Sequence, residues 1–98
     1  MTYSEFWTAA SELAHHQREG IQKADIGDYR IEAIYNHSSN YGGAPFSHYS
    51  VFIYDLAKNP YTPIKGWHSD CMVITDRWLG VVRKWADAYL TKHCGVTL

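Results

Sequence analysis

Apolar and polar positions alternate most clearly in the middle of the chain, between Asp28 and Leu56. A period of two is typical of a β-strand that has one buried face. The later part of this stretch, residues 49–54, is apolar on both faces and rich in β-branched and aromatic residues. We therefore predict two antiparallel strands joined by a long loop. On the first strand, the residues that share one face are Tyr29, Ile31, Ala33 and Tyr35.

Apolar residues recur at helical spacing near both ends of the chain. Thr2 and Glu5 fit a capping box that starts a first helix, and Gly20 suits a position just after its end. A second helix is expected to start at Thr75 or Asp76. Its apolar stripe places Trp85 in the middle, so we expect this side chain in the core. The stripe contains Trp78, Leu79, Val81, Val82, Trp85, Ala86 and Tyr89.

The remaining segments predict one more strand and two connections. Residues 23–27 are expected to form a turn, and residues 58–66 a loop with two prolines and a glycine. Residues 67–73 alternate weakly and predict a third strand. The predicted fold is α+β with the order αβββα: a three-stranded antiparallel meander with two helices packed on one face. At 98 residues, the chain (1–98) is expected to be a single domain.

Charge and composition narrow the function classes. The net charge of −1 lacks the basic surplus of a typical nucleic-acid-binding protein. No apolar run approaches the roughly 18–20 residues of a membrane span, and no secretion signal is visible at the first residues. Two cysteines make no disulfide framework. We therefore expect a cytoplasmic protein that does not contact a membrane.

Six histidines and two cysteines raise the question of a metal site. No CxxC, HExxH or HxH motif occurs, and His68 and Cys71 would point to opposite faces of a strand. Serines, histidines and Asp55 lie near the predicted hairpin, but no nucleophile elbow is present. We expect no metal, no cofactor and no catalytic residues. A small enzyme that uses His and Tyr side chains is one alternative.

A second alternative comes from the order of the elements. The order αβββα is similar to that of double-stranded-RNA-binding domains, and residues 43–48 resemble the Gly-Pro-x-His loop between their first two strands. The resemblance implies RNA binding through phosphate contacts from lysines at the start of the last helix. Here that place holds Thr75, Asp76, Arg77 and Trp78, which lack this charge.

The long loop is the most informative feature for function. Residues 36–49 are rich in Tyr, Ser, Gly and Asn, a mixture that is typical of protein-recognition surfaces. We therefore predict a small, non-enzymatic protein-binding module. Its size and type fit an inhibitor carried by a phage or mobile element and directed at a host defence system, as in anti-CRISPR proteins. The sequence also leaves a homodimer open. The predicted contact residues are Tyr41, Phe46, Tyr49 and Tyr54 as anchors, His37, Asn40 and His48 as polar contacts, and Arg77, Arg83 and Lys84 as steering charges.

Overall fold

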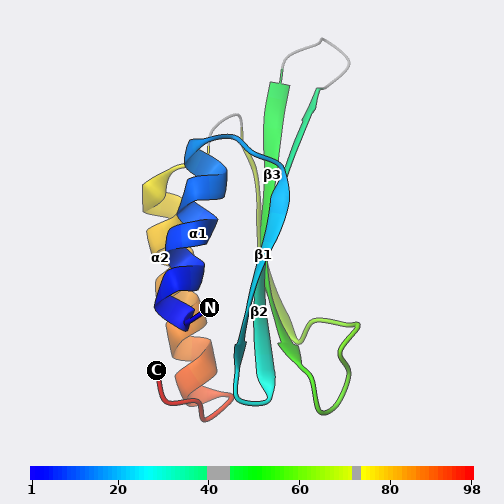
Figure 1. Ribbon diagram of the computed structural model, residues 1–98, viewed down its shortest axis with the longest axis vertical. Helices are drawn as coiled ribbons and strands as arrows, with labels where there is room; N and C mark the ends of the chain where they lie inside the picture. Colours follow the sequence, from blue (N-terminus) through cyan, green and yellow to red (C-terminus); the bar gives the residue numbers. More distant parts are fainter. Residues whose placement is uncertain (40–44, 72–73) are drawn as a thin grey trace.

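The computed structural model describes residues 1–39, 45–71 and 74–98 and shows an α+β fold of two layers (Figure 1). The strands form one antiparallel sheet in the order β1-β2-β3-β4, so each strand pairs with its neighbour in sequence. This confirms the predicted α+β class, the meander and the two flanking helices, but the sheet has four strands instead of three. The elements are α1 (Tyr3–His15), β1 (Gly20–Ile26), β2 (Tyr29–Ser39), β3 (Pro45–Asp55), β4 (Lys65–Cys71) and α2 (Asp76–Lys92).

The extra strand, β1, occupies residues that the sequence assigned to the end of the first helix and to a turn. Helix α1 begins with the predicted capping box at Thr2 but ends at His15, and Gln17 then takes a positive φ of 47°. The inward positions of β1 include Gln22 and Ala24, so the strand has little apolar signal. It forms because β2 supplies the backbone pairing along its whole length.

The central hairpin is longer than the pattern of the sequence indicates. Strands β2 and β3 pair over eleven positions, from Tyr29 opposite Asp55 to Ser39 opposite Pro45. Strand β1 reaches only as far as Tyr35, and β4 only as far as Ser47. The ends of β2 and β3 therefore extend beyond the rest of the sheet (Figure 1).

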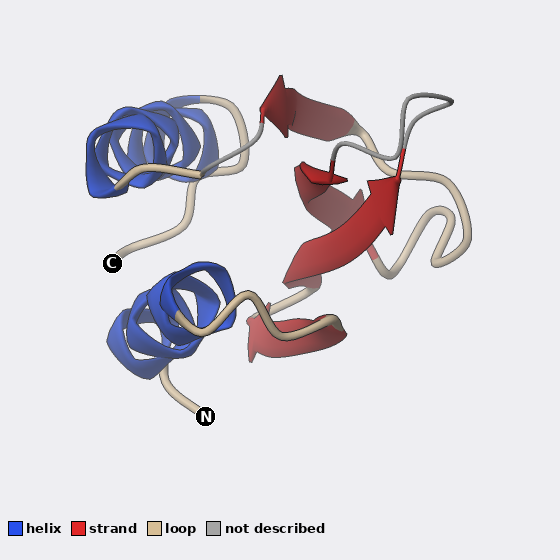
Figure 2. Ribbon diagram, turned by 90° about the horizontal axis from the view of Figure 1, so that it is seen from above, coloured by secondary structure: helices blue, strands red, loops and turns tan. Residues whose placement is uncertain are grey.

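Both helices cover the same face of the sheet, and the core lies between the two layers (Figure 2). The central strands contribute alternate residues such as Ile31, Val51 and Ile53, all fully buried. Two polar contacts are built into this core. The hydroxyls of Tyr35 and Ser47 form a buried hydrogen bond of 2.8 Å, and the Tyr49 hydroxyl donates to the backbone carbonyl of Ala10.

Helix α2 faces the core with a narrower stripe than predicted. Its buried residues are spaced three or four positions apart and lie on one side of the helix: Leu79, Val82, Ala86 and Leu90. Trp85 lies off this line and is 52% exposed, so the prediction that it occupies the core is wrong. Within the described part of the chain, no helix is long and apolar enough to cross a membrane.

Candidate functional site

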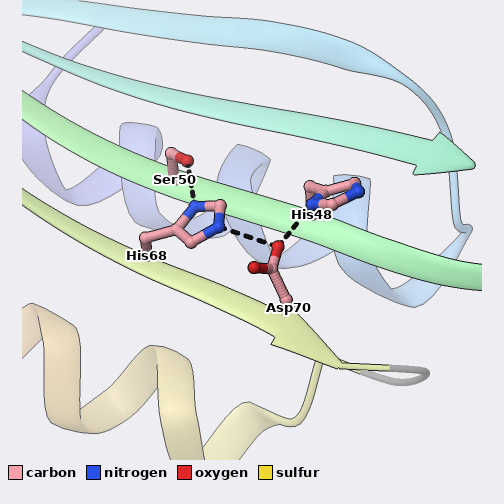
Figure 3. A network of polar contacts seen from close by, with 4 residues as sticks. All are labelled: His48, Ser50, His68 and Asp70. Atoms are coloured by element: carbon pink, nitrogen blue, oxygen red, sulfur yellow. Dashed lines mark hydrogen bonds and ion pairs between the residues drawn. The ribbon is translucent and has the colours of Figure 1, made fainter.

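The face of the sheet opposite the helices carries a block of polar side chains on β3 and β4. His48 and Ser50 lie two residues apart on β3, as His68 and Asp70 do on β4, so all four side chains point to the same face. The register places His48 opposite Asp70 and Ser50 opposite His68. Directly opposite residues on paired strands bring their side chains into contact. The sheet itself therefore assembles this cluster (Figure 3).

The four side chains form one connected network. A single carboxylate oxygen, Oδ1 of Asp70, interacts with Nδ1 of His48 and lies 2.7 Å from Nε2 of His68. On the other side of the same ring, Nδ1 of His68 lies 2.8 Å from the Ser50 hydroxyl. The two imidazole rings stack, with centroids 6.1 Å apart and planes at 24°. The geometry thus fixes both rings around one carboxylate.

The network also has a defined electrostatic state. The hydrogen bond from His48, supported by that from His68, holds the pKa of the Asp70 carboxyl below its usual range. Asp70 is therefore ionised at neutral pH and accepts hydrogen bonds from both rings. If His68 is neutral and donates from Nε2, its Nδ1 accepts from the Ser50 hydroxyl.

Two chemical roles suit such a group. The order Ser50, His68, Asp70 matches a nucleophile, a base and an orienting acid. However, the side chains of His68 and Asp70 are each 51% exposed. Water therefore reaches the polar atoms, whereas transition-state stabilisation by fixed dipoles is strongest in a water-excluded site. The arrangement is better suited to binding than to covalent catalysis.

The second role is metal binding. One ligand atom from each of His48, His68 and Asp70 lies within 4.8 Å of the others. No metal site is predicted from the sequence because no CxxC, HExxH or HxH motif occurs, and His48 and His68 are twenty positions apart. A signal becomes visible only when the β3–β4 register is known. Within β4, His68 forms a hydrogen bond with Asp70, which lies two residues further along the strand and on the same face.

A shallow groove between β4 and α2 is the second surface with a distinct composition. It contains three aromatic side chains and three that are basic or can become so. Nζ of Lys65 lies 5.9 Å from the ring centroid of Trp67, and the Tyr89 and His93 rings stack at 4.9 Å. Trp85, which is 52% exposed, lines the groove as well. The residues that line this groove, which we call the α2–β4 groove, are Lys65, Trp67, Trp85, Ala88, Tyr89, Lys92 and His93.

The structure separates the predicted contact residues into several groups. His48 and Tyr54 lie on the open face of the sheet, where the Tyr54 ring contacts Phe52. His37 is exposed on the projecting hairpin, and its backbone N–H donates to the Glu19 carboxylate. Arg77, Arg83 and Lys84 are exposed on α2, in the other layer of the fold. Those predicted contact residues that the structure describes are therefore not gathered on one surface.

The structure corrects the prediction that Tyr49 is a contact residue on the surface. This side chain is fully buried, and its ring packs edge-on against Trp78 while its hydroxyl bonds Ala10. Its position on the inner face of the central strand makes it part of the core, so the expectation of a surface anchor at Tyr49 is wrong. Asn40 and Tyr41 lie outside the described residues, as does the side chain of Phe46.

Comparison with models of protein families, with curated proteins and with solved structures finds no match for this chain.

Proposed function

We propose that the protein is a non-enzymatic binding module whose partner is another protein. The observation that carries this proposal is the α2–β4 groove, where Trp85 is 52% exposed beside two lysines. Large aromatic side chains are the most frequent anchors of protein interfaces. An exposed tryptophan on a helix that already buries four other side chains adds little to folding, which supports a role in recognition.

The lining of the groove indicates the chemistry of the partner. Lys65, Lys92 and His93 contribute positive or protonatable groups, and none of the described residues that line the groove is acidic. We infer that the groove accepts a short acidic segment that carries an aromatic or large apolar side chain. Cations around an apolar centre steer an acidic partner and fix its orientation. A nucleic acid is less well suited, because two lysines release few counterions and the chain has a net charge of −1.

The projecting β2–β3 hairpin supports a second contact. Its strands extend past both neighbouring strands, which places the ends of β2 and β3 clear of the sheet. The proposal that its loop recognises the partner rests on the Tyr, Ser, Gly and Asn content of residues 36–49. An inhibitor of a host defence system, carried by a phage or mobile element, remains our proposal for the biological setting. The size of the chain and its open surfaces support it.

A peptide library tests the groove directly. Randomised twelve-residue peptides are selected on the purified protein, and the enriched sequences are measured by fluorescence anisotropy. We expect acidic sequences with one aromatic or large apolar residue. Binding should weaken about 30-fold or more in Trp85→Ala, since truncated hot spots lose about 2 kcal/mol or more. Lys92→Glu should weaken the same peptides.

The chain offers matched controls for both changes. Tyr61 is 90% exposed and lies outside the groove, so Tyr61→Ala removes an exposed aromatic ring without touching the site. Lys58→Glu reverses a charge in the same loop. Equal binding by the parent and Trp85→Ala would contradict the proposal. Preferred binding of a single-stranded oligonucleotide with a steep salt dependence would favour the nucleic-acid alternative.

The hairpin has its own test in the same assay format. Once a partner protein is known, the double change Tyr41→Ala with Phe46→Ala is compared with Trp85→Ala. Loss of binding in the double variant alone assigns recognition to the hairpin, and loss in Trp85→Ala alone assigns it to the groove. Binding that survives both changes contradicts both sites.

A further inference from the structure

We propose that His48, His68 and Asp70 bind one divalent transition-metal ion on the open face of the sheet. The proposal is independent of the α2–β4 groove, because the open face and the inward side chain of Trp67 lie on opposite sides of β4. Two imidazoles and one carboxylate form a donor set that suits zinc and its neighbours in the first transition row.

The backbone already places the three donors at nearly the required separation. Ligand bonds of about 2.0–2.2 Å in a tetrahedral site put donor atoms about 3.3 Å apart. The three donor atoms here lie within 4.8 Å of one another, and Nε2 of His68 is 2.7 Å from Oδ1 of Asp70. Small side-chain rotations therefore admit an ion in place of the present hydrogen bonds. All three residues stand on paired strands, which keep their Cα positions fixed.

The Ser50 hydroxyl supplies the support that metal-binding histidines usually have. A histidine ligand normally donates its other ring N–H to a nearby acceptor, which fixes its tautomer and orientation. With Nε2 of His68 directed to the ion, its Nδ1–H points at Ser50 Oγ, 2.8 Å away (Figure 3). The network therefore contains both the ligands and an outer partner that orients one of them.

Three protein ligands leave part of the coordination sphere open. In a four-coordinate ion, the remaining position is available to water or to a donor atom from another molecule. Because the side chains of His68 and Asp70 are about half exposed, that position faces solvent. The proposed site is therefore an open one, whose ion a carboxylate, imidazole or similar ligand can reach.

Titration of the purified, untagged protein with Zn²⁺ and Co²⁺ tests the site. Calorimetry should give one equivalent of zinc, and the cobalt complex should show the visible absorption of a protein-bound ion. His48→Ala, His68→Ala and Asp70→Ala should each weaken binding by more than the roughly 10- to 100-fold that follows loss of an outer partner. Ser50→Ala should weaken zinc binding by only about 10- to 100-fold, because Ser50 is the outer partner of His68. Circular dichroism establishes that each variant is folded.

The exposed pair of His15 and Asp76 provides the matched control. It joins α1 to α2 through a contact of 2.6 Å and has the same residue types, but among the described residues no third ligand completes it. His15→Ala and Asp76→Ala should therefore leave zinc binding unchanged. The proposal is overturned if the parent binds no zinc, if the three ligand variants bind like the parent, or if His15→Ala loses binding to the same extent as His68→Ala.

Discussion

The hydroxyl of Tyr49 donates a hydrogen bond of 2.8 Å to the backbone carbonyl of Ala10, and this bond joins the inner face of β3 to helix α1. Both residues are fully buried, and they are 39 positions apart in the chain. The contact therefore fixes the position of the first helix over the sheet.

Removal of this hydroxyl should destabilise the protein modestly. The Ala10 carbonyl has a second lone pair that serves the helix, so Tyr49→Phe should lower the free energy of unfolding by about 1 kcal/mol. Urea denaturation measures the change. Tyr54→Phe, at a partly exposed position on the other face, should change stability by less than about 0.5 kcal/mol. Equal urea midpoints for Tyr49→Phe and the parent would show that the bond contributes nothing.

The buried and exposed sides of α2 should respond very differently to truncation. Leu90 is fully buried, so Leu90→Ala should cost about 2–5 kcal/mol. Trp85 is half exposed, so Trp85→Ala should stay within about 0.5 kcal/mol of the parent. Thermal melts of both variants check the orientation of the helix. A melting temperature that falls more for Trp85→Ala than for Leu90→Ala would reverse the assignment of buried and exposed sides.

The sequence predicted the elements whose apolar pattern is strong. The alternation at Ile31 and Ala33 and the capping box at Thr2 both correspond to what the structure shows. Strand β1 was missed because edge pairing with β2 holds it in place, while its inward positions include Gly20 and Gln22. The pattern of apolar residues gives no information on backbone pairing between strands, and so it cannot reveal such a strand.

The candidate site was predictable only in part. Composition pointed to histidines, and His48 was among the predicted contact residues. Its proximity to His68 and Asp70 depends on the register of β3 and β4, which a single sequence does not specify. Trp85 and Tyr49 exchanged their expected roles for a related reason: both sit on apolar elements, and only the packing of the layers decides which side is covered.

The buried pair of Tyr35 and Ser47 should behave as a unit. Ser47→Ala removes the partner of a buried hydroxyl 2.8 Å away, so stability should fall by about 1–3 kcal/mol. The double variant Tyr35→Phe with Ser47→Ala removes both polar groups and should be more stable than Ser47→Ala alone. Urea titrations of the two single variants, the double variant and the parent complete the cycle. Strict additivity would show that the two hydroxyls do not interact.

Alkaline pH should unfold the protein through its buried phenols. Burial raises the pKa of Tyr49, and burial together with the hydrogen bond to Asp87 raises that of Tyr3. The unfolded chain has tyrosine pKa values of about 10. Because the folded pKa is the higher one, this stabilisation is complete below about pH 10 and is lost as the pH rises through the folded value. Tyrosinate absorbance followed with circular dichroism should show late ionisation that coincides with unfolding.

The two helices that share one face of the sheet come from opposite ends of the sequence, and this has a consequence for the order of folding. Each strand pairs with its neighbour in sequence, so the sheet can assemble by successive hairpins. The inner face of the sheet is exposed to water until both α1 and α2 have packed on it. The hydrogen bond between Tyr3 of α1 and Asp87 of α2 joins residues 84 positions apart in the chain. Loop-closure entropy makes that contact slow to form. We expect the transition state to contain β2 and β3, with high φ-values at Ile31 and Ile53 and low ones at Leu90.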